Sequence, residues 1–298
     1  MDYQSDTTTQ SGDSRSRFVN QKRFVKILLR RKVTIFSVVV ITICIIVAIF
    51  APLIAPYSPY DQELSRSLDT PSWQYLLGND KYGRDILSRL IYGSRLSLAI
   101  SFVAVGFGGT LGTTLGVVSG YFGGWTDAII MRVVDAFLAI PRLITALCIA
   151  VVLGHGVGNI MLALGISIVP GFARLVRSVT LSVKENDYVL ASRLIGASHL
   201  RTMFLHVLPN AMPQLLVHIT IQMGLVILAE ASLSFLGIGL TSNQIAWGSM
   251  VSTGQIYLIT RPMLSLAPGV LVLLLALSWN LLGDGLRDAL DPRLRGTL

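Results

Sequence analysis

Long apolar runs alternate with short polar stretches along most of this chain. A transmembrane helix needs about 17 to 25 predominantly apolar residues, and six runs are close to that length. The pattern therefore predicts an all-α integral membrane protein with six transmembrane helices. The expected spans are residues 33–54, about 96–120, a run that ends near 153, about 160–176, about 211–236 and about 264–282.

The composition supports a polytopic membrane protein. The chain is 52% hydrophobic and 13% charged, and its mean hydropathy is +0.66, values outside the range of soluble globular proteins. The net charge of +8 does not indicate nucleic-acid binding, because the basic residues cluster beside apolar runs instead of forming a patch with aromatics. Cys44 and Cys148 both lie inside apolar runs, so we interpret them as small core residues and not as a disulfide or metal pair.

Charge next to the first apolar run sets the expected orientation. Residues 1–32 form a basic segment that begins with a polar stretch of about 17 residues, for which we expect disorder. Basic residues flank the cytoplasmic side of membrane spans, so both ends of the chain are expected in the cytoplasm. The run at 33–54 is too extended for a cleaved signal peptide and is interpreted as a retained span.

The remaining segments follow from that orientation. Residues 55–95 should lie outside and carry an interfacial helix in which Asp85 and Arg89 pair. Residues 96–284 form the core, with Trp247 in an outer segment at 240–262 and Trp279 opening the end of the last span. Residues 285–298 should form a cytoplasmic tail whose acidic and basic side chains pair with one another. The residues concerned are Asp284, Asp288 and Asp291, with Arg287, Arg293 and Arg295.

Glycine recurs at every fourth position in the second expected span. A stripe of small residues lets another helix approach closely, and such packing drives helix association in lipid. No Gly-Lys-Ser/Thr sequence ends a glycine-rich loop anywhere in the chain, so a phosphate loop is excluded and we expect no ATP binding by this chain. The glycines of this stripe are Gly108, Gly112, Gly116 and Gly120.

The loop after this span should be a short inner turn, in which Arg132 and Asp135 are spaced to pair. Pro141 lies inside the next apolar run and should kink the third span, because proline removes a backbone donor. His155 lies in a glycine-rich outer turn and is interpreted as a loop histidine.

Residues 184–210 are polar and prone to form helices, although apolar runs lie on both sides. Such an insert must lie on a membrane face. Asn186 or Asp187 can cap a first helix, Gly196 can end it in the left-handed conformation, and Ser198 can begin a second. Tyr188, Ala191, Leu194 and Ile195 would share one apolar face, and Pro209 marks the start of the next span. These features fit either a plain interfacial helix or a helix that contacts a partner.

The fifth span is the most polar. Gln214, His218 and Gln222 are spaced by four residues, and Glu230 lies further along the same run. Polar groups in a span face protein or water and avoid lipid. The stripe therefore either makes hydrogen bonds between helices or lines a translocation path, and the sequence leaves both interpretations open.

Residues 184–210 resemble the "EAA" signature of ABC importer permeases. Ala191, Ser192, Gly196, Leu208 and Pro209 fall on that pattern, while Leu190 stands where the signature has Glu and Ser192 where it has a second Ala. The resemblance implies a coupling helix that docks into a cleft on a separate ATPase subunit. The implied coupling residues are Asp187, Tyr188, Ala191, Ser192, Ile195, Gly196, Ala197, Ser198, Leu208 and Pro209.

Three further stretches resemble the C-type permease of dipeptide, oligopeptide and nickel ABC importers. They are "GRDILSRLIYGSRLSL", "EASLSFLGIGL" and the end of the chain from "APGVLVLLLALSWN". The resemblance implies a type I ABC importer transmembrane domain in a bacterial inner membrane, surrounded by lipid. Its implied partners are a B-type permease, two ATPase subunits that bind ATP and Mg²⁺, and an external substrate-binding protein.

Several functions remain open at this stage. Proteins of the family that this chain resembles transport dipeptides, longer peptides, glutathione, nickel or metal chelates. A secondary transporter usually places several ionisable groups at mid-membrane, whereas here only Glu230 qualifies; a membrane scaffold without transport is a third class. We expect no enzyme activity, cofactor or metal site, because no His/Cys cluster has metal-ligand spacing and no catalytic constellation is present.

Overall fold

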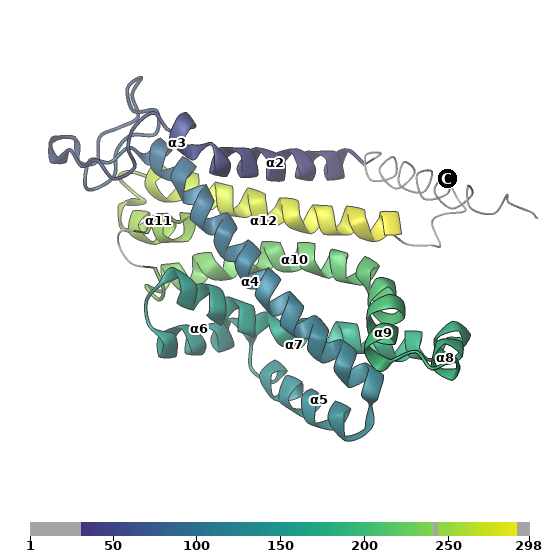
Figure 1. The fold of residues 1–298 in the computed structure, drawn as a ribbon. Helices are drawn as coiled ribbons and strands as arrows, with labels where there is room; N and C mark the ends of the chain where they lie inside the picture. Colours follow the sequence, from purple (N-terminus) through teal and green to yellow (C-terminus); the bar gives the residue numbers. More distant parts are fainter. Residues whose placement is uncertain (1–30, 241–243, 291–298) are drawn as a thin grey trace, which may run out of the picture.

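The computed structural model describes residues 31–240 and 244–290. Secondary structure in these residues is helical, apart from one isolated bridge between Asn79 and Asp85. The long helices run side by side, with α3 and α11 at one end of the bundle and α8 and α9 at the other (Figure 1). The predicted disorder near the N-terminus lies outside the described residues.

Five helices in the described ranges are long and apolar enough to cross a membrane, or six if one bent pair counts as a single span. The five are α2 (Lys32–Ile49), α4 (Ile86–Phe122), α7 (Val157–Lys184), α10 (Leu208–Phe235) and α12 (Met263–Leu290); the pair is α5 (Gly124–Leu138) with α6 (Arg142–Leu153). The prediction of an all-α membrane protein is confirmed, with the third of the six spans broken in two. The short elements are α3 (Ala51–Ile54), η1 (Leu64–Arg66), α8 (Asp187–Leu194), α9 (His199–Thr202), η2 (Met203–Val207), α11 (Trp247–Gly254) and η3 (Gln255–Tyr257).

The break in the third span falls where proline predicted a kink. Pro141 caps the start of α6, and α5 and α6 meet at 93°. The preceding segment was wrongly predicted to be a short turn, because α5 is a helix of 15 residues. The predicted Arg132–Asp135 pair is also wrong. Asp135 instead accepts from Arg174 of α7 at 2.5 Å, and Arg177 holds Asp127 with two bonds of 2.5 Å.

The external segment contains no separate interfacial helix, so the predicted boundary at residue 95 is wrong. Asp85 caps α4 by accepting from the Ser88 backbone N–H at 2.8 Å, and the helix then continues unbroken for 37 residues. Since the carboxylate is used as a cap, Asp85 does not pair with Arg89. Arg89 donates to the Pro59 carbonyl at 3.0 Å and lies 3.6 Å from Asp80.

The glycine stripe of α4 lies against α7, and this is the most extensive helix contact in the fold. A Cβ added to Gly112 would lie 2.6 Å from the carbonyl oxygen of Val169 and 2.5 Å from Cβ of Phe172. Gly108, Gly116 and Gly120 would meet α7 equally closely. Because no side chain separates them, the two backbones approach each other directly.

Within the predicted outer segment, Trp247–Gly254 form α11, which packs against α10 and α12. The Trp247 side chain is buried, and its indole N–H donates to the Leu90 carbonyl at 2.9 Å. Trp279 lies within α12 and packs edge-on against Phe102 at a centroid distance of 6.0 Å. Where the membrane boundary falls relative to Trp279 stays a prediction.

Replacement of Trp247 by Phe should lower the stability of the protein. The replacement keeps an aromatic ring, although one smaller than indole, and it loses the buried bond to Leu90. The loss of such a bond costs about 1 to 2 kcal/mol. Thermal unfolding of the purified protein in detergent would measure the change. Trp125 is 85% exposed, so Trp125→Phe is the matched control and should leave the unfolding temperature unchanged. An equal effect of both changes would contradict the importance of the buried bond.

The end of the chain also differs from the prediction. Helix α12 continues through Asp284 and Asp288 to Leu290, so the expected tail boundary at residue 285 falls inside a helix. Asp288 forms an ion pair with Arg31, which precedes α2. Asp291, Arg293 and Arg295 lie outside the described residues. Both cysteines are free, and Cys148 is exposed on α6, so its assignment to the core is wrong.

Candidate functional site

The segment 184–210 forms one end of the bundle, opposite α3 and α11 (Figure 1). Helix α8 leads through a tight turn to α9, and α9 continues through the π-helical turn η2 into α10. Pro209 marks the start of α10, as predicted, and η2 joins α10 without a loop. Leu208 and Pro209 form the first turn of α10.

The turn between α8 and α9 depends on one glycine. Gly196 has φ of +85°, and its N–H donates to the Arg193 carbonyl at 3.0 Å. Ala197 N–H donates to the Ser192 carbonyl at 3.1 Å, which closes the end of α8. Ser198 then caps α9 by accepting from the Arg201 N–H at 3.3 Å. The predicted roles of Gly196 and Ser198 agree with this geometry.

The start of α8 differs from expectation. Asn186 occupies the cap position, but no side chain accepts a bond from the helix there. The Asn186 amide instead lies 3.5 Å from the Tyr188 hydroxyl, which also accepts from Asn210 at 3.1 Å. This network ties α8 to the beginning of α10. Asp187 is the first residue of α8, where a negative charge favours the helix dipole.

Helix α8 turns its predicted apolar face outward. Val189 and Ser192 are buried against the rest of the chain. Ala191 is exposed, Tyr188 is partly exposed, and Leu194 and Ile195 are 88% and 86% exposed. An exposed apolar surface of this kind marks a site of contact with another protein or with a membrane.

Contacts that the sequence did not suggest hold this segment against α4. The Tyr121 hydroxyl lies 3.1 Å from Nδ1 of His199, and the Arg193 guanidinium stacks over the Tyr121 ring at 4.5 Å. Lys184 donates to the Gly120 carbonyl at 3.0 Å. These contacts join α8, α9 and the last residue of α7 to the end of α4.

The polar stripe of α10 is only partly assembled in space. His218 Nε2 and Gln222 Nε2 lie 3.2 Å apart, and the His218 ring packs edge-on against Phe172 of α7. Gln222 Oε1 accepts from Arg142 of α6 at 2.5 Å. Gln214 lies exposed nearer the start of α10. Arg142 was missed because it follows Pro141 in the sequence, and the broken span that places it beside α10 is a tertiary feature.

Glu230 belongs to a different environment. Its side chain is buried, and Oε1 accepts from the Ser234 hydroxyl at 2.8 Å. Gly248 of α11 packs directly against the carboxyl group. The structure therefore brings Glu230 to α11 and not to His218 and Gln222. Whether any of these side chains lines a path remains a prediction.

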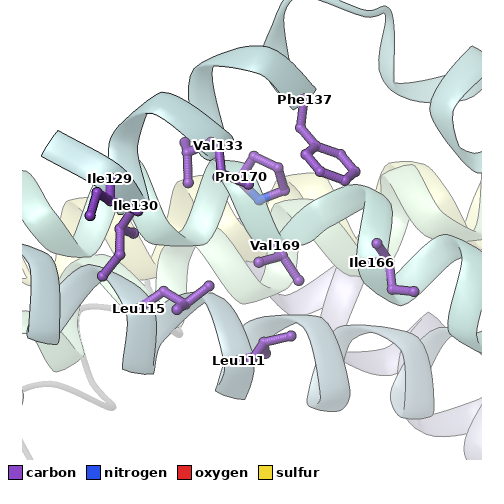
Figure 2. Close-up of a pocket in the computed structure, with 10 residues that line it drawn as sticks. Leu111, Leu115, Ile129, Ile130, Val133, Phe137, Ile166, Val169 and Pro170 are labelled. Atoms are coloured by element: carbon purple, nitrogen blue, oxygen red, sulfur yellow. The ribbon is translucent and has the colours of Figure 1, made fainter. Parts of the chain in front are cut away.

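A cavity of about 320 Å³ lies between α4, α5 and α7 (Figure 2). Its lining is aliphatic and aromatic, with Leu111, Val133, Phe137 and Pro170 among the side chains that face it. Without a polar group it offers nothing to orient a hydrophilic solute. In the described residues no group of three or more His, Cys, Asp or Glu side chains could hold a metal ion.

Comparison with known proteins identifies the family. Residues 112–296 match the family described as "Binding-protein-dependent transport system inner membrane component". The chain belongs to this family. Residues 21–71 also match the "N-terminal TM domain of oligopeptide transport permease C". Together the matches extend over most of the chain, including α8, α9 and the polar stripe, and they confirm the resemblance seen in the sequence.

Individual relatives carry two kinds of name. The chain is 40% identical to the dipeptide transport system permease protein DppC of Alkalihalophilus pseudofirmus, over 91% of this chain and 89% of the relative. It is 40% identical to DppC of Haemophilus influenzae, over 88% and 90% of the two chains. It is 37% identical to the glutathione transport system permease protein GsiD of Pectobacterium atrosepticum, over 92% and 91%.

A solved structure shares the fold. The inward-facing MetNI methionine ABC transporter has a chain that matches with a TM-score of 0.55 and 22% identity, covering 68% of this chain and 97% of the other. This likeness confirms the helical arrangement of a type I ABC importer permease. The family match and the long apolar helices together show that the protein is a multi-pass membrane permease subunit.

Proposed function

We propose that this chain is the C-type permease subunit of an ATP-driven importer for dipeptides or oligopeptides. The similarity to DppC over about nine-tenths of both chains carries the proposal. GsiD relatives are nearly as similar, so glutathione, itself a peptide, is the second candidate substrate. The chain itself performs no covalent chemistry, and ATP with Mg²⁺ would bind to partner ATPases.

The exposed face of α8 suggests how ATP hydrolysis is coupled to transport. Leu194 and Ile195 would enter a cleft on an ATPase subunit, and closure of the ATPases would move α8 and α9. Tyr121 and Lys184 connect this segment to α4 and α7, so the movement would rearrange the spans. A B-type permease would supply the other half of the path, and an external binding protein would deliver substrate at the end formed by α3 and α11.

Affinity purification from the native membrane tests this assembly. We expect a second permease and one or two ATPases to be recovered with the chain, and ATP-dependent uptake of a dipeptide once the co-encoded binding protein is added. Recovery of the chain alone, with uptake that is driven by an ion gradient, would contradict the proposal.

Both termini should be protected from an external protease, in agreement with a cytoplasmic location.

The docking surface has its own test. Replacing Leu194 and Ile195 together by Ser should leave the free energy of unfolding within about 0.5 kcal/mol, because both side chains are exposed. Binding of the ATPase should weaken at least about tenfold, since central apolar anchors of interfaces each contribute more than about 1 kcal/mol. Titration with the purified ATPase would measure the loss.

Ile259 provides the control for this pair. It is 98% exposed and lies between η3 and α12, far along the chain from α8, so Ile259→Ser should leave ATPase affinity unchanged. Unchanged affinity in the Leu194/Ile195 variant would refute the docking assignment.

A further inference from the structure

Arg142 is the least satisfied basic group in the interior of the described bundle. Its Nη1 donates to Gln222, but Nε and Nη2 are buried without a hydrogen-bond partner. Within residues 31–240 and 244–290, no acidic side chain forms an ion pair with it. Buried donors are nearly always paired, and an exception calls for an explanation.

The two free nitrogens are adjacent. In a guanidinium group, Nε and Nη2 lie along one edge of the plane and form a fork whose geometry matches the two oxygens of a carboxylate. Gln222 occupies only Nη1, on the other side of the group. It thereby orients the guanidinium and leaves the fork available.

Arg142 and Gln222 lie at positions that suit the binding of a transported solute. Gln222 lies near the middle of α10, and Arg142 begins α6 at the break in the third span. The N-terminal end of a broken helix carries partial positive charge and favours an anionic group. His218 adds a hydrogen-bonding group beside Gln222, and Gly171 of α7 presents no side chain toward either of them.

We propose that Arg142, Gln222 and His218 form a carboxylate-binding subsite within the substrate path. The inference rests on the proposed function and specifies it, because every peptide with a free C-terminus, including glutathione, supplies such a carboxylate. A bare divalent cation would be repelled by the guanidinium. Both free nitrogens are shielded in this conformation, so a carboxylate reaches them when α6 and α10 separate.

Two substitutions test the subsite in the complete transporter, reconstituted with its partner subunits and supplied with binding protein loaded with alanyl-alanine. Arg142→Gln removes the fork. Gln222→Glu keeps Arg142 in place and gives it an internal carboxylate, which competes with the substrate. Each should reduce ATP-dependent uptake at least tenfold, while ATPase stimulation by the loaded binding protein stays within twofold of the original.

The second variant separates substrate binding from structural bracing. If Arg142 served only to join α6 to α10, Gln222→Glu would strengthen that link and uptake would be normal, which would refute the subsite. If either variant loses ATPase stimulation to the same extent as uptake, the subsite is refuted as well. Arg95 is an exposed arginine of α4, so Arg95→Gln is the charge-matched control and should transport normally.

Failure of the broader proposal has a different signature. If the unmodified complex shows no ATP-dependent uptake of any peptide, the peptide-importer function fails and the subsite fails with it. If the unmodified complex transports alanyl-alanine and Gln222→Glu does so equally well, only the subsite is refuted.

Discussion

Gly112→Leu should prevent stable folding of the protein. A Cβ at this position would already lie within 2.6 Å of the Val169 carbonyl oxygen and of Cβ of Phe172. Neither obstacle is the end of a flexible side chain, so α4 and α7 would have to separate along their most extensive contact. Overpacking of an interior costs about 1 to 3 kcal/mol when neighbours can adjust, and we expect at least the upper value here.

The measurement is the yield of monodisperse protein in detergent, together with its thermal unfolding temperature. Gly106 provides a control on the same helix, because a Cβ there would meet nothing within 4 Å. Gly106→Leu should give normal yield, although it changes the composition and helix propensity of α4 identically. Equal behaviour of the two variants would show that the close approach of α4 to α7 is not essential.

Local chemistry explains what the sequence could predict. Gly196 is the residue that a left-handed turn requires, and the four-residue spacing of small residues in α4 anticipated a close helix contact. Pro141 predicted the break before α6 because its ring and missing N–H act within its own chain segment. Each of these signals is contained within a few neighbouring residues.

The failures involve partners that are distant in sequence. Arg89 has the spacing to pair with Asp85, but it instead donates to the carbonyl of Pro59, 30 residues earlier in the chain. Trp247 is anchored by a carbonyl 157 residues earlier in the chain. Arg142 reaches Gln222 only because α6 turns away from α5 by 93°. No local pattern contains that information.

Gly196→Val should separate ATP hydrolysis from transport while leaving the protein in the membrane. Gly196 has φ of +85°, which costs a residue with a Cβ about 1 to 2 kcal/mol and a β-branched residue more. A Cβ at Gly196 would meet nothing within 4 Å, so the penalty falls on the turn alone. This energy reduces the population of the native α8–α9 turn about 5- to 30-fold, and we expect uptake and ATPase binding to fall at least fivefold.

Two further variants identify the cause. Gly196→Asn should retain most activity, because Asn tolerates the left-handed region. Gly123 also has positive φ and open surroundings but joins α4 to α5, so Gly123→Val imposes comparable strain outside the α8–α9 turn and should keep ATPase binding. If Gly196→Val binds the ATPase and transports normally, the α8–α9 turn does not couple the two processes. Equal loss of ATPase binding in Gly123→Val and Gly196→Val would show that strain at this end of the bundle, and not the α8–α9 turn, causes the loss. We expect a difference, because the exposed Leu194 and Ile195 lie next to Gly196.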